Sequence, residues 1–341
     1  MTKKITAILL SLCMLVPLVG VCASAETASL SDGLPALQDT FKFGIGSAVN
    51  NVTMDYYYFE PDADGKYPLV IWLHGLVSGG WPGRQITKND ISYWASKEFQ
   101  SRFTGGGAFI LAPRSTETVS VWGDNMVEPL KGCIDQFIAA HSDKIDTKRI
   151  YLGGLSMGGK MTVKMTAAYP EMFAAVFPCS PYYTLSDELA KGCANTPIWQ
   201  LSSKDDCYMD YETRIKPDWD KMMSYSNRRA DCRYTVMDTA LKPDGTAPGT
   251  THDTWYAATY DMFMYNRAEF TGSVTYDGNG RVVTLKYPRG MIYWLNRYTS
   301  DYVPEKLPEQ APSTMFGNMY RVLMSLFAAL ARALGLKGVL G

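Results

Sequence analysis

A serine framed by glycines is the first feature of this sequence that could do chemistry. The run GLSMG at 154–158 matches the pattern Gly-x-Ser-x-Gly, with an apolar run before it and a helix-compatible segment after it. That context is typical of a nucleophile elbow, in which a strained turn between a strand and a helix presents a serine hydroxyl at the carboxyl edge of a sheet. A plain glycine-rich turn gives the same pattern, so the interpretation of Ser156 as a nucleophile depends on finding its base.

Three histidines could be that base: His74, His141 and His252. His141 ends a predicted helix, where a histidine usually caps carbonyl groups or faces solvent. His74 comes straight after the most apolar run, upstream of the serine, and could simply shape its own loop. His252 follows the last predicted core strand and a long loop, which is where the base falls in folds built around this elbow. We therefore predict His252 as the general base.

The base needs a carboxylate that holds it in the correct tautomer, and chain order places this acid between the serine and the histidine. The run PIWQL is followed by SSKDDCYMD, so Asp205, Asp206 and Asp210 are the candidates. A solvated acidic turn would contain the same residues. The pattern alone leaves the choice among the three open.

Seven apolar runs predict the strands that position these residues. They lie at 51–60, 69–75, 108–113, 149–154, 174–179, 197–201 and 232–237, and helix-compatible segments lie between them at 126–141, 156–170 and 209–226. Strands that alternate with helices favour right-handed crossovers and a mostly parallel sheet with helices on both faces. The predicted fold class is therefore α/β. A hairpin over 272–286, around the turn at 277–280, is predicted without a role in the chemistry.

The overall composition is that of one large folded domain. The chain has 341 residues, is 46% hydrophobic and carries a formal net charge of -1. Such a chain can bury a sizeable core, and it has no basic run that would attract nucleic acid. We expect partners that are uncharged or modestly charged.

Both termini differ from the domain between them. Residues 1–25 have two lysines, an apolar run and an Ala-Ser-Ala ending, the layout of a secretory signal peptide. Apolar residues at helical spacing predict an amphipathic helix at 315–336, after a proline-containing linker at 301–314. That helix could dock on the domain or contact a membrane surface or another protein. The catalytic domain is expected at 26–300, with its core at about 45–300, in a secreted or cell-surface protein.

Five cysteines remain after the predicted signal peptide. Export permits disulfides, and the odd number leaves at least one thiol unpaired. Their positions relative to the predicted strands suggest the pairs Cys179–Cys207 and Cys193–Cys232, with Cys133 free in its helix. No two have the C-x-x-C spacing of a zinc site, so no structural metal is expected.

The order of several segments resembles a known family. PLVIWLHG, AFILAPRS, GGLSMGG, PIWQLSSKDD and THDTW are similar to segments of secreted α/β-hydrolase esterases grouped with polyhydroxybutyrate depolymerases and feruloyl esterases, over roughly residues 45–300. The resemblance implies an α/β-hydrolase fold and hydrolysis of acyl esters without a cofactor. It also implies that Asp206 is the acid. The family's His-Gly pair is missing from this loop, so Asp205 remains an alternative.

The same resemblance implies the oxyanion hole. The family's His-Gly pair after the early strand matches His74-Gly75, so the donors are the backbone N–H groups of Leu76 and Met157. Six side chains lie just beyond predicted strand ends or catalytic residues and are candidates for substrate contact, although each could equally pack under a loop: His74, Trp81, Trp122, Tyr182, Tyr183 and Trp255.

The predicted function is therefore a secreted serine esterase acting on feruloyl, acetyl or polyester-like esters. Two alternatives remain open. A serine peptidase of the prolyl-oligopeptidase type shares the fold and the triad order, although nothing here resembles its large gating domain. A non-catalytic surface-attached binding protein would need a decayed site, against which the complete set Ser156, Asp206 and His252 argues.

Overall fold

A nine-stranded sheet forms the centre of the computed structural model, which describes residues 34–76, 83–115, 121–265, 272–285 and 290–301. The strand order is β1-β2-β4-β3-β5-β6-β7-β8-β9, and neighbours from β4 to β8 are parallel, whereas β1, β2 and β9 are antiparallel to their neighbours. The strands are β1 Lys42–Ile45, β2 Asp55–Phe59, β3 Tyr67–Leu73, β4 Phe109–Pro113, β5 Ile145–Leu155, β6 Ala175–Cys179, β7 Trp199–Ser203, β8 Arg233–Met237 and β9 Val274–Asp277.

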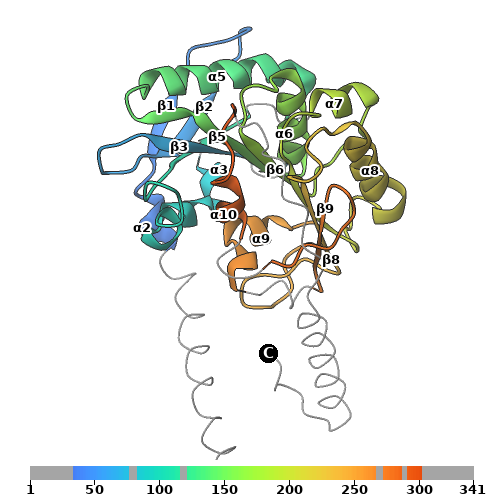
Figure 1. Ribbon diagram of the computed structural model, residues 1–341. Helices are drawn as coiled ribbons and strands as arrows, with labels where there is room; N and C mark the ends of the chain where they lie inside the picture. Colours follow the sequence, from blue (N-terminus) through green and yellow to red (C-terminus); the bar gives the residue numbers. More distant parts are fainter. Residues whose placement is uncertain (1–33, 77–82, 116–120, 266–271, 286–289, 302–341) are drawn as a thin grey trace, which may run out of the picture. The chain divides into compact units, whose positions relative to one another are not determined.

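Helices cover both faces of this sheet, as an all-parallel centre requires. Figure 1 shows α5 to α8 over one face and α3, α9 and α10 over the other. The described helices are α2 Leu34–Gln38, α3 Arg84–Thr87, α4 Lys97–Gln100, α5 Val127–Ala140, α6 Met157–Ala168, α7 Asp187–Gly192, α8 Lys216–Tyr225, α9 Trp255–Thr259 and α10 Met291–Leu295. Short turns of other helix types are η2 Ile91–Ala95, η3 Asp124–Met126, η4 Tyr211–Ile215 and η5 Met262–Tyr265.

The strongest sequence signals lie at the centre of the sheet. Every residue of β3, YPLVIWL, is buried, because this strand is covered on both faces and pairs with β4 and β5. All seven predicted strands and the three predicted helices are present, and the α/β prediction is confirmed. The short strand β1 and the helices of four to six residues escaped prediction, since elements of that length carry too little periodicity to detect.

The region 272–286 contains the predicted turn, and its first strand also extends the central sheet. β9 joins the central sheet as its edge strand and pairs with β8. Among the described residues it meets its return segment at the bridge Tyr276↔Val282, where the Asp277 N–H donates to the Arg281 carbonyl and the Val283 N–H to the Thr275 carbonyl, each at 2.8 Å. The turn itself is as expected, with Gly280 at a φ of 77°.

The predicted disulfides are wrong, because all five described cysteines are free. Cys179 ends β6 with a buried side chain, whereas Cys207 is exposed on the loop after β7, so the two side chains lie in different environments. Cys193 and Cys232 are buried in one core, where their thiols approach a backbone carbonyl and a serine hydroxyl instead. Cys133 is free in α5, as expected.

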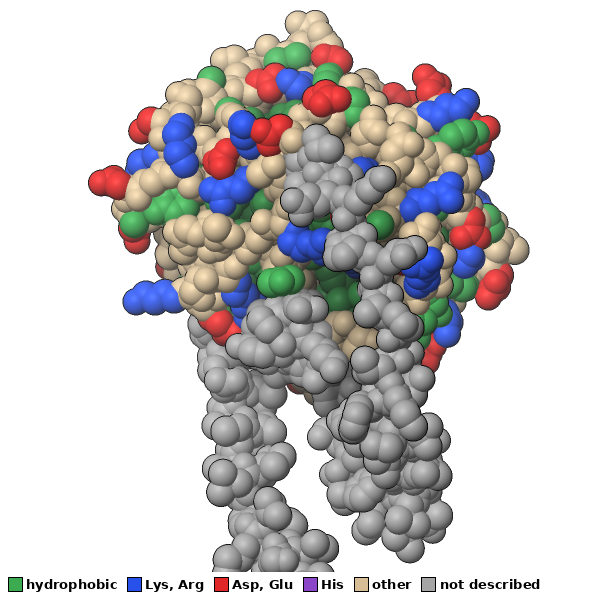
Figure 2. All heavy atoms as spheres, viewed as in Figure 1, with side chains coloured by type: hydrophobic (Ala, Val, Ile, Leu, Met, Phe, Trp, Pro, Cys, Tyr) green, Lys and Arg blue, Asp and Glu red, His purple; other side chains and the backbone are tan. Residues whose placement is uncertain are grey.

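Several predictions fall outside the described residues: the signal peptide at 1–25, Trp81, the amphipathic helix at 315–336 and all but Asp301 of the linker. Within the described ranges, no helix has the length and apolarity needed to span a bilayer, and no group of three or more His, Cys, Asp or Glu side chains could hold a metal ion. Figure 2 shows basic and acidic side chains interspersed over the face it presents.

Candidate active site

Ser156 occupies a strained turn between β5 and α6. Its φ of 57° and ψ of -113° are unusual for a residue with a side chain. The glycines beside it are required by close packing: a Cβ on Gly154 would lie 2.6 Å from the carbonyl carbon of Gly158, and a Cβ on Gly158 would overlap the carbonyl oxygen of Leu73 in β3. The backbone at the end of β5 therefore leaves space only for glycine on both sides of the serine.

Asp206 and His252 form a hydrogen-bonded pair on two loops. Asp206 Oδ2 lies 2.7 Å from His252 Nδ1, and Asp206 Oδ1 accepts hydrogen bonds from the N–H groups of Tyr208 and Met209 at 2.9 and 3.1 Å. Both members of the pair are buried. Because the carboxylate accepts, the proton of a neutral imidazole lies on Nδ1, and Nε2 carries the lone pair that a general base needs.

The other two candidate carboxylates have different partners. Asp205 Oδ1 accepts from Ser203 Oγ at 2.5 Å, and Asp210 caps the η4 turn by accepting from Thr213 N–H at 2.7 Å. Only Asp206 among the three contacts His252 in the part of the chain that the structure describes.

A cavity of about 560 Å³ brings the serine and the histidine together at the carboxyl ends of the strands. Ser156 and His252 both line it, and His252 Nε2 is buried without a hydrogen-bond partner among the described residues. Gly75, Leu76 and Met157 line the same cavity. An acyl group entering it would meet a hydroxyl, an unpaired imidazole nitrogen and two candidate backbone donors.

The predicted substrate contacts of His74 and Trp122 are wrong. Both side chains are fully buried, at 0% exposure, so neither can touch a substrate. His74 Nε2 accepts a hydrogen bond from Ser115 N–H at 3.1 Å, and Trp122 Nε1–H donates to the His74 carbonyl at 2.8 Å. These residues were chosen because they follow strand ends, and a place in the chain does not reveal which way a side chain points. Tyr183 is likewise buried in the main core and does not line the cavity.

His74 instead controls the shape of the loop that carries Leu76. Since its Nε2 is an acceptor, the ring proton is on Nδ1, which donates to the Gly75 carbonyl at 2.8 Å. In a trans peptide the C=O and N–H point in opposite directions, so this bond turns the Leu76 N–H away from the His74 ring. Burial lowers the pKa of His74 to about 4, which keeps the ring neutral in this arrangement.

Two of the predicted aromatic contacts, Tyr182 and Trp255, do line the cavity, and sequence reasoning missed two more, Tyr208 and Tyr256. The Tyr208 ring is 61% exposed and stands edge-on to His252, with 5.0 Å between ring centroids. Its only sequence signal was its place two residues after the acid. Leu76 and Tyr182, at 52% and 44% exposure, add further apolar surface to the lining.

Part of the chain matches known esterases. Residues 122–237 match the family described as Phospholipase/Carboxylesterase. A poly(3-hydroxybutyrate) depolymerase from Ralstonia pickettii is 28% identical over 149 aligned residues, covering 38% of this chain and 29% of that protein. A bifunctional acetylxylan esterase/xylanase from Neocallimastix patriciarum is 28% identical over 148 aligned residues, covering 42% of this chain and 20% of that protein. The chain spans less than a third of the length of these two relatives.

A solved structure of a thermostable esterase superposes with a TM-score of 0.55 at 24% identity, covering 69% of this chain and 64% of that one. At that identity the likeness concerns the fold alone. Together with the strand order, these matches establish an α/β-hydrolase fold and support an esterase family for the chain.

Proposed function

We propose that this protein is a secreted serine ester hydrolase, with Ser156 as nucleophile, His252 as general base and Asp206 as the carboxylate that orients it. The observation that carries the proposal concerns His252, which lines the same cavity as Ser156: its Nδ1 is held by Asp206, and its Nε2 has no hydrogen-bond partner among the residues that the structure describes. A hydroxyl is a weak nucleophile at neutral pH, and an adjacent oriented base is what activates it.

The reaction would proceed in two acyl-transfer steps. His252 Nε2 takes the proton of Ser156 as the serine oxygen attacks the ester carbonyl, and Asp206 stabilises the imidazolium that forms. The tetrahedral oxyanion is bound by the backbone N–H groups of Leu76 and Met157. Met157 is the first residue of α6, where an N–H has no partner within the helix and the helix dipole favours negative charge. His252 then protonates the departing alcohol, and water releases the acyl group by the same sequence of proton transfers.

The cavity favours an uncharged ester with a flat or apolar portion. Its lining is largely apolar and aromatic, and its charged side chains are one of each sign, the exposed Lys88 and the half-buried Asp253. Leu76, Tyr182 and Tyr208 are exposed there, which suits acyl or aryl groups that remove apolar area from water. The names of the two curated relatives, a polyester depolymerase and an acetylxylan esterase, agree with acyl esters of hydroxyl-bearing polymers.

The proposal also includes export of the protein and a role for its C-terminal residues. The leader-like residues 1–25 would direct the chain out of the cell, where polymeric esters are met, and the apolar face of residues 315–336 would contact a membrane surface or another protein.

A fluorophosphonate probe tests the enzyme proposal directly, because it labels only an activated serine. We expect the wild-type protein to be labelled and Ser156→Ala to be unlabelled, while Ser142→Ala, a change at an exposed serine just after α5 and outside the catalytic cavity, labels normally. The same proteins are then assayed with acetyl, feruloyl and 3-hydroxybutyrate esters beside a peptide amide. An unlabelled wild-type protein, or labelling that survives Ser156→Ala, removes the proposal. Faster turnover of the peptide would identify a peptidase instead.

A further inference from the structure

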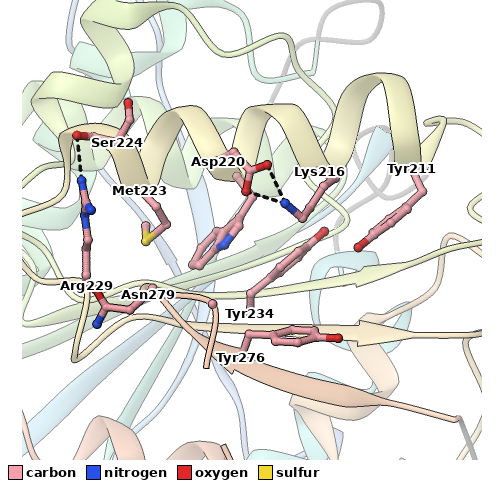
Figure 3. A pocket seen from close by; sticks show the side chains of 12 residues that line it. Tyr211, Lys216, Asp220, Met223, Ser224, Arg229, Tyr234, Tyr276 and Asn279 are labelled. Atoms are coloured by element: carbon pink, nitrogen blue, oxygen red, sulfur yellow. Dashed lines mark hydrogen bonds and ion pairs between the residues drawn. The ribbon is translucent and has the colours of Figure 1, made fainter. Parts of the chain in front are cut away.

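A second cavity, of about 660 Å³, lies between α8 and the turn after β9. It shares no lining residue with the catalytic cavity, and its size is in the range of sites for small molecules. Figure 3 shows the helix over it and the edge strand beneath it. The residues that line it are Tyr211, Lys216, Trp219, Asp220, Met223, Ser224, Arg229, Tyr234, Tyr276, Gly278, Asn279 and Gly280.

Aromatic rings form one side of this cavity. Trp219 and Tyr234 stack with 4.8 Å between centroids and are buried, so they make a rigid base. Tyr211 and Tyr276 are half-buried, and Figure 3 shows their rings beside Tyr234 at the same end of the cavity. Rings of this kind combine a flat apolar body with a polar hydroxyl, and they lose little conformational entropy when a ligand packs on them.

Polar groups occupy the rest of the lining. Lys216 Nζ pairs with Asp220 at 2.5 Å on the exposed side of α8. At the other end, Arg229 is exposed and donates one of the five N–H groups of its guanidinium to the Ser224 carbonyl at 3.0 Å. Asn279 is exposed in the turn beside it and offers an amide donor and acceptor.

This combination points to a carbohydrate rather than to the other common ligand classes. Flat rings suit the apolar faces of pyranose rings, and planar amide, carboxylate and guanidinium groups suit their hydroxyls. A phosphorylated ligand would require more positive charge, since Lys216 is already neutralised by Asp220 and Arg229 is the remaining cation in the described lining. A lipid chain would require an apolar lining without an ion pair.

The chain also links this cavity to the catalytic one. Tyr208 lines the catalytic cavity and Tyr211 lines the second, and three residues of extended chain span at most about 11 Å. Both tyrosines belong to the segment that begins with Asp206, which is hydrogen-bonded to His252. A long ligand held at Tyr211 and Tyr276 would therefore lie within reach of the Ser156 cavity.

We propose that the cavity between α8 and the β9 turn binds a carbohydrate chain and so holds a polysaccharide-linked ester near Ser156. The binding part stands by itself, whereas the delivery part rests on the proposed esterase function. Rings, amide and guanidinium would contact the polymer, and the ester branching from it would enter the catalytic cavity.

Native gels cast with soluble arabinoxylan, polygalacturonate or mixed-linkage β-glucan test the binding part. We expect at least one polymer to retard the wild-type protein and the Ser156→Ala variant equally. Tyr276→Ala and Arg229→Ala should each weaken retardation about tenfold, and Tyr276→Phe, which keeps the ring, should retain it. Tyr293→Ala is the matched control, because Tyr293 is 45% exposed on α10 and lies in neither cavity.

The surface substitution Arg229→Ala keeps the test valid if Tyr276→Ala fails to fold. No retardation by any of the three polymers, or equal retardation of wild type, Tyr276→Ala and Arg229→Ala, overturns the binding part.

The delivery part is tested by kinetics. The ratio of kcat/KM on an acetylated polymer to kcat/KM on a small aryl acetate should fall about tenfold in Arg229→Ala and stay at the wild-type ratio in Tyr293→Ala. An unchanged ratio in Arg229→Ala overturns the delivery part. A protein that binds polymer but is not labelled by fluorophosphonate would refute the esterase proposal and leave the carbohydrate site standing.

Discussion

Ser156 and the Asp206–His252 pair face one cavity, but different forces hold them there. The serine lies where β3, β5 and α6 meet, and contacts between backbones require glycine at 154 and 158. The pair lies on the loops after β7 and β8, where hydrogen bonds rather than backbone contacts fix its position. The backbone N–H groups of Tyr208 and Met209 donate to Asp206, and Thr251 Oγ1 donates to the Asp205 carbonyl at 2.6 Å. Packing thus positions the nucleophile, and a few polar contacts position its base.

The largest effect on kcat should come from the hydrogen bond between Asp206 and His252, on the two loops that form one side of the catalytic cavity (the loop side). Asp206→Asn keeps the shape but offers an amide to His252 Nδ1, which favours the wrong tautomer, and we expect kcat on an aryl acetate to fall about 10⁴-fold. Asp205→Asn is the matched control on the neighbouring residue and should change kcat less than about threefold, because its carboxylate contacts Ser203 rather than His252. A large loss in Asp205→Asn with a small one in Asp206→Asn would reverse the assignment.

The same contrast explains which parts of the site are predictable from sequence. The glycines that backbone packing requires lie within two residues of Ser156, so the nucleophile elbow can be recognised in a run of five residues. The choice of Asp206 over Asp205 depends on a contact between residues 46 positions apart, and no local pattern encodes it. A resemblance to known esterases was needed to favour it.

Side-chain direction was the least predictable feature. His74 and Trp122 were expected to contact substrate because of where they stand along the chain, yet both turn into the core. Similarly, Cys179 ends one strand and Cys207 follows its neighbour, yet the first side chain is buried and the second is exposed. Seven of the strands could be predicted because each is an apolar run long enough to detect, whereas the direction of a side chain beyond a strand end depends on tertiary packing.

On the nucleophile side, the next largest effect should come from His74. His74→Phe removes the donor to the Gly75 carbonyl, so the Leu76 N–H loses its fixed direction, and kcat should fall about 10²-fold, as when one oxyanion donor is lost. His74→Asn retains a short N–H donor and should recover part of the rate. KM should change little in either variant, because the donor acts on the transition state. Equal kcat values in wild type and His74→Phe would refute the positioning role.

The lowered pKa of His74 leads us to predict that the free energy of unfolding depends on pH. Its pKa of about 4 in the folded protein lies below the ordinary value of 6.5, so between these values the unfolded chain binds the additional proton and stability falls as pH falls. The loss should reach about 3 kcal/mol near pH 4. Asp261 acts in the opposite direction, because burial raises its pKa to about 6 and its protonation favours the folded state as pH falls.

Comparison with His74→Phe separates the two contributions, since Asp261 is present in both proteins. Urea unfolding at about pH 7.5 and about pH 4 should show the stability advantage of wild type over the variant shrinking by about 3 kcal/mol on acidification. An advantage that stays constant or grows would show that His74 is not buried in its neutral form.

The smallest effect on kcat should come from the contact between the His252 loop and the end of β6. Ser180, directly after β6, has a φ of 39°, and its buried Oγ lies 2.9 Å from Thr254 Oγ1. The Thr254 N–H in turn donates to the His252 carbonyl at 2.9 Å. Thr254→Val keeps the side-chain shape and removes this link, which should cost about 1 kcal/mol and lower kcat roughly tenfold as His252 loosens. Thr246→Val, the same change at an exposed position, should leave kcat unaltered. If Thr254→Val lowers stability but keeps wild-type kcat, the His252 loop is held by packing as firmly as the serine, and the contrast between the two sides of the cavity fails.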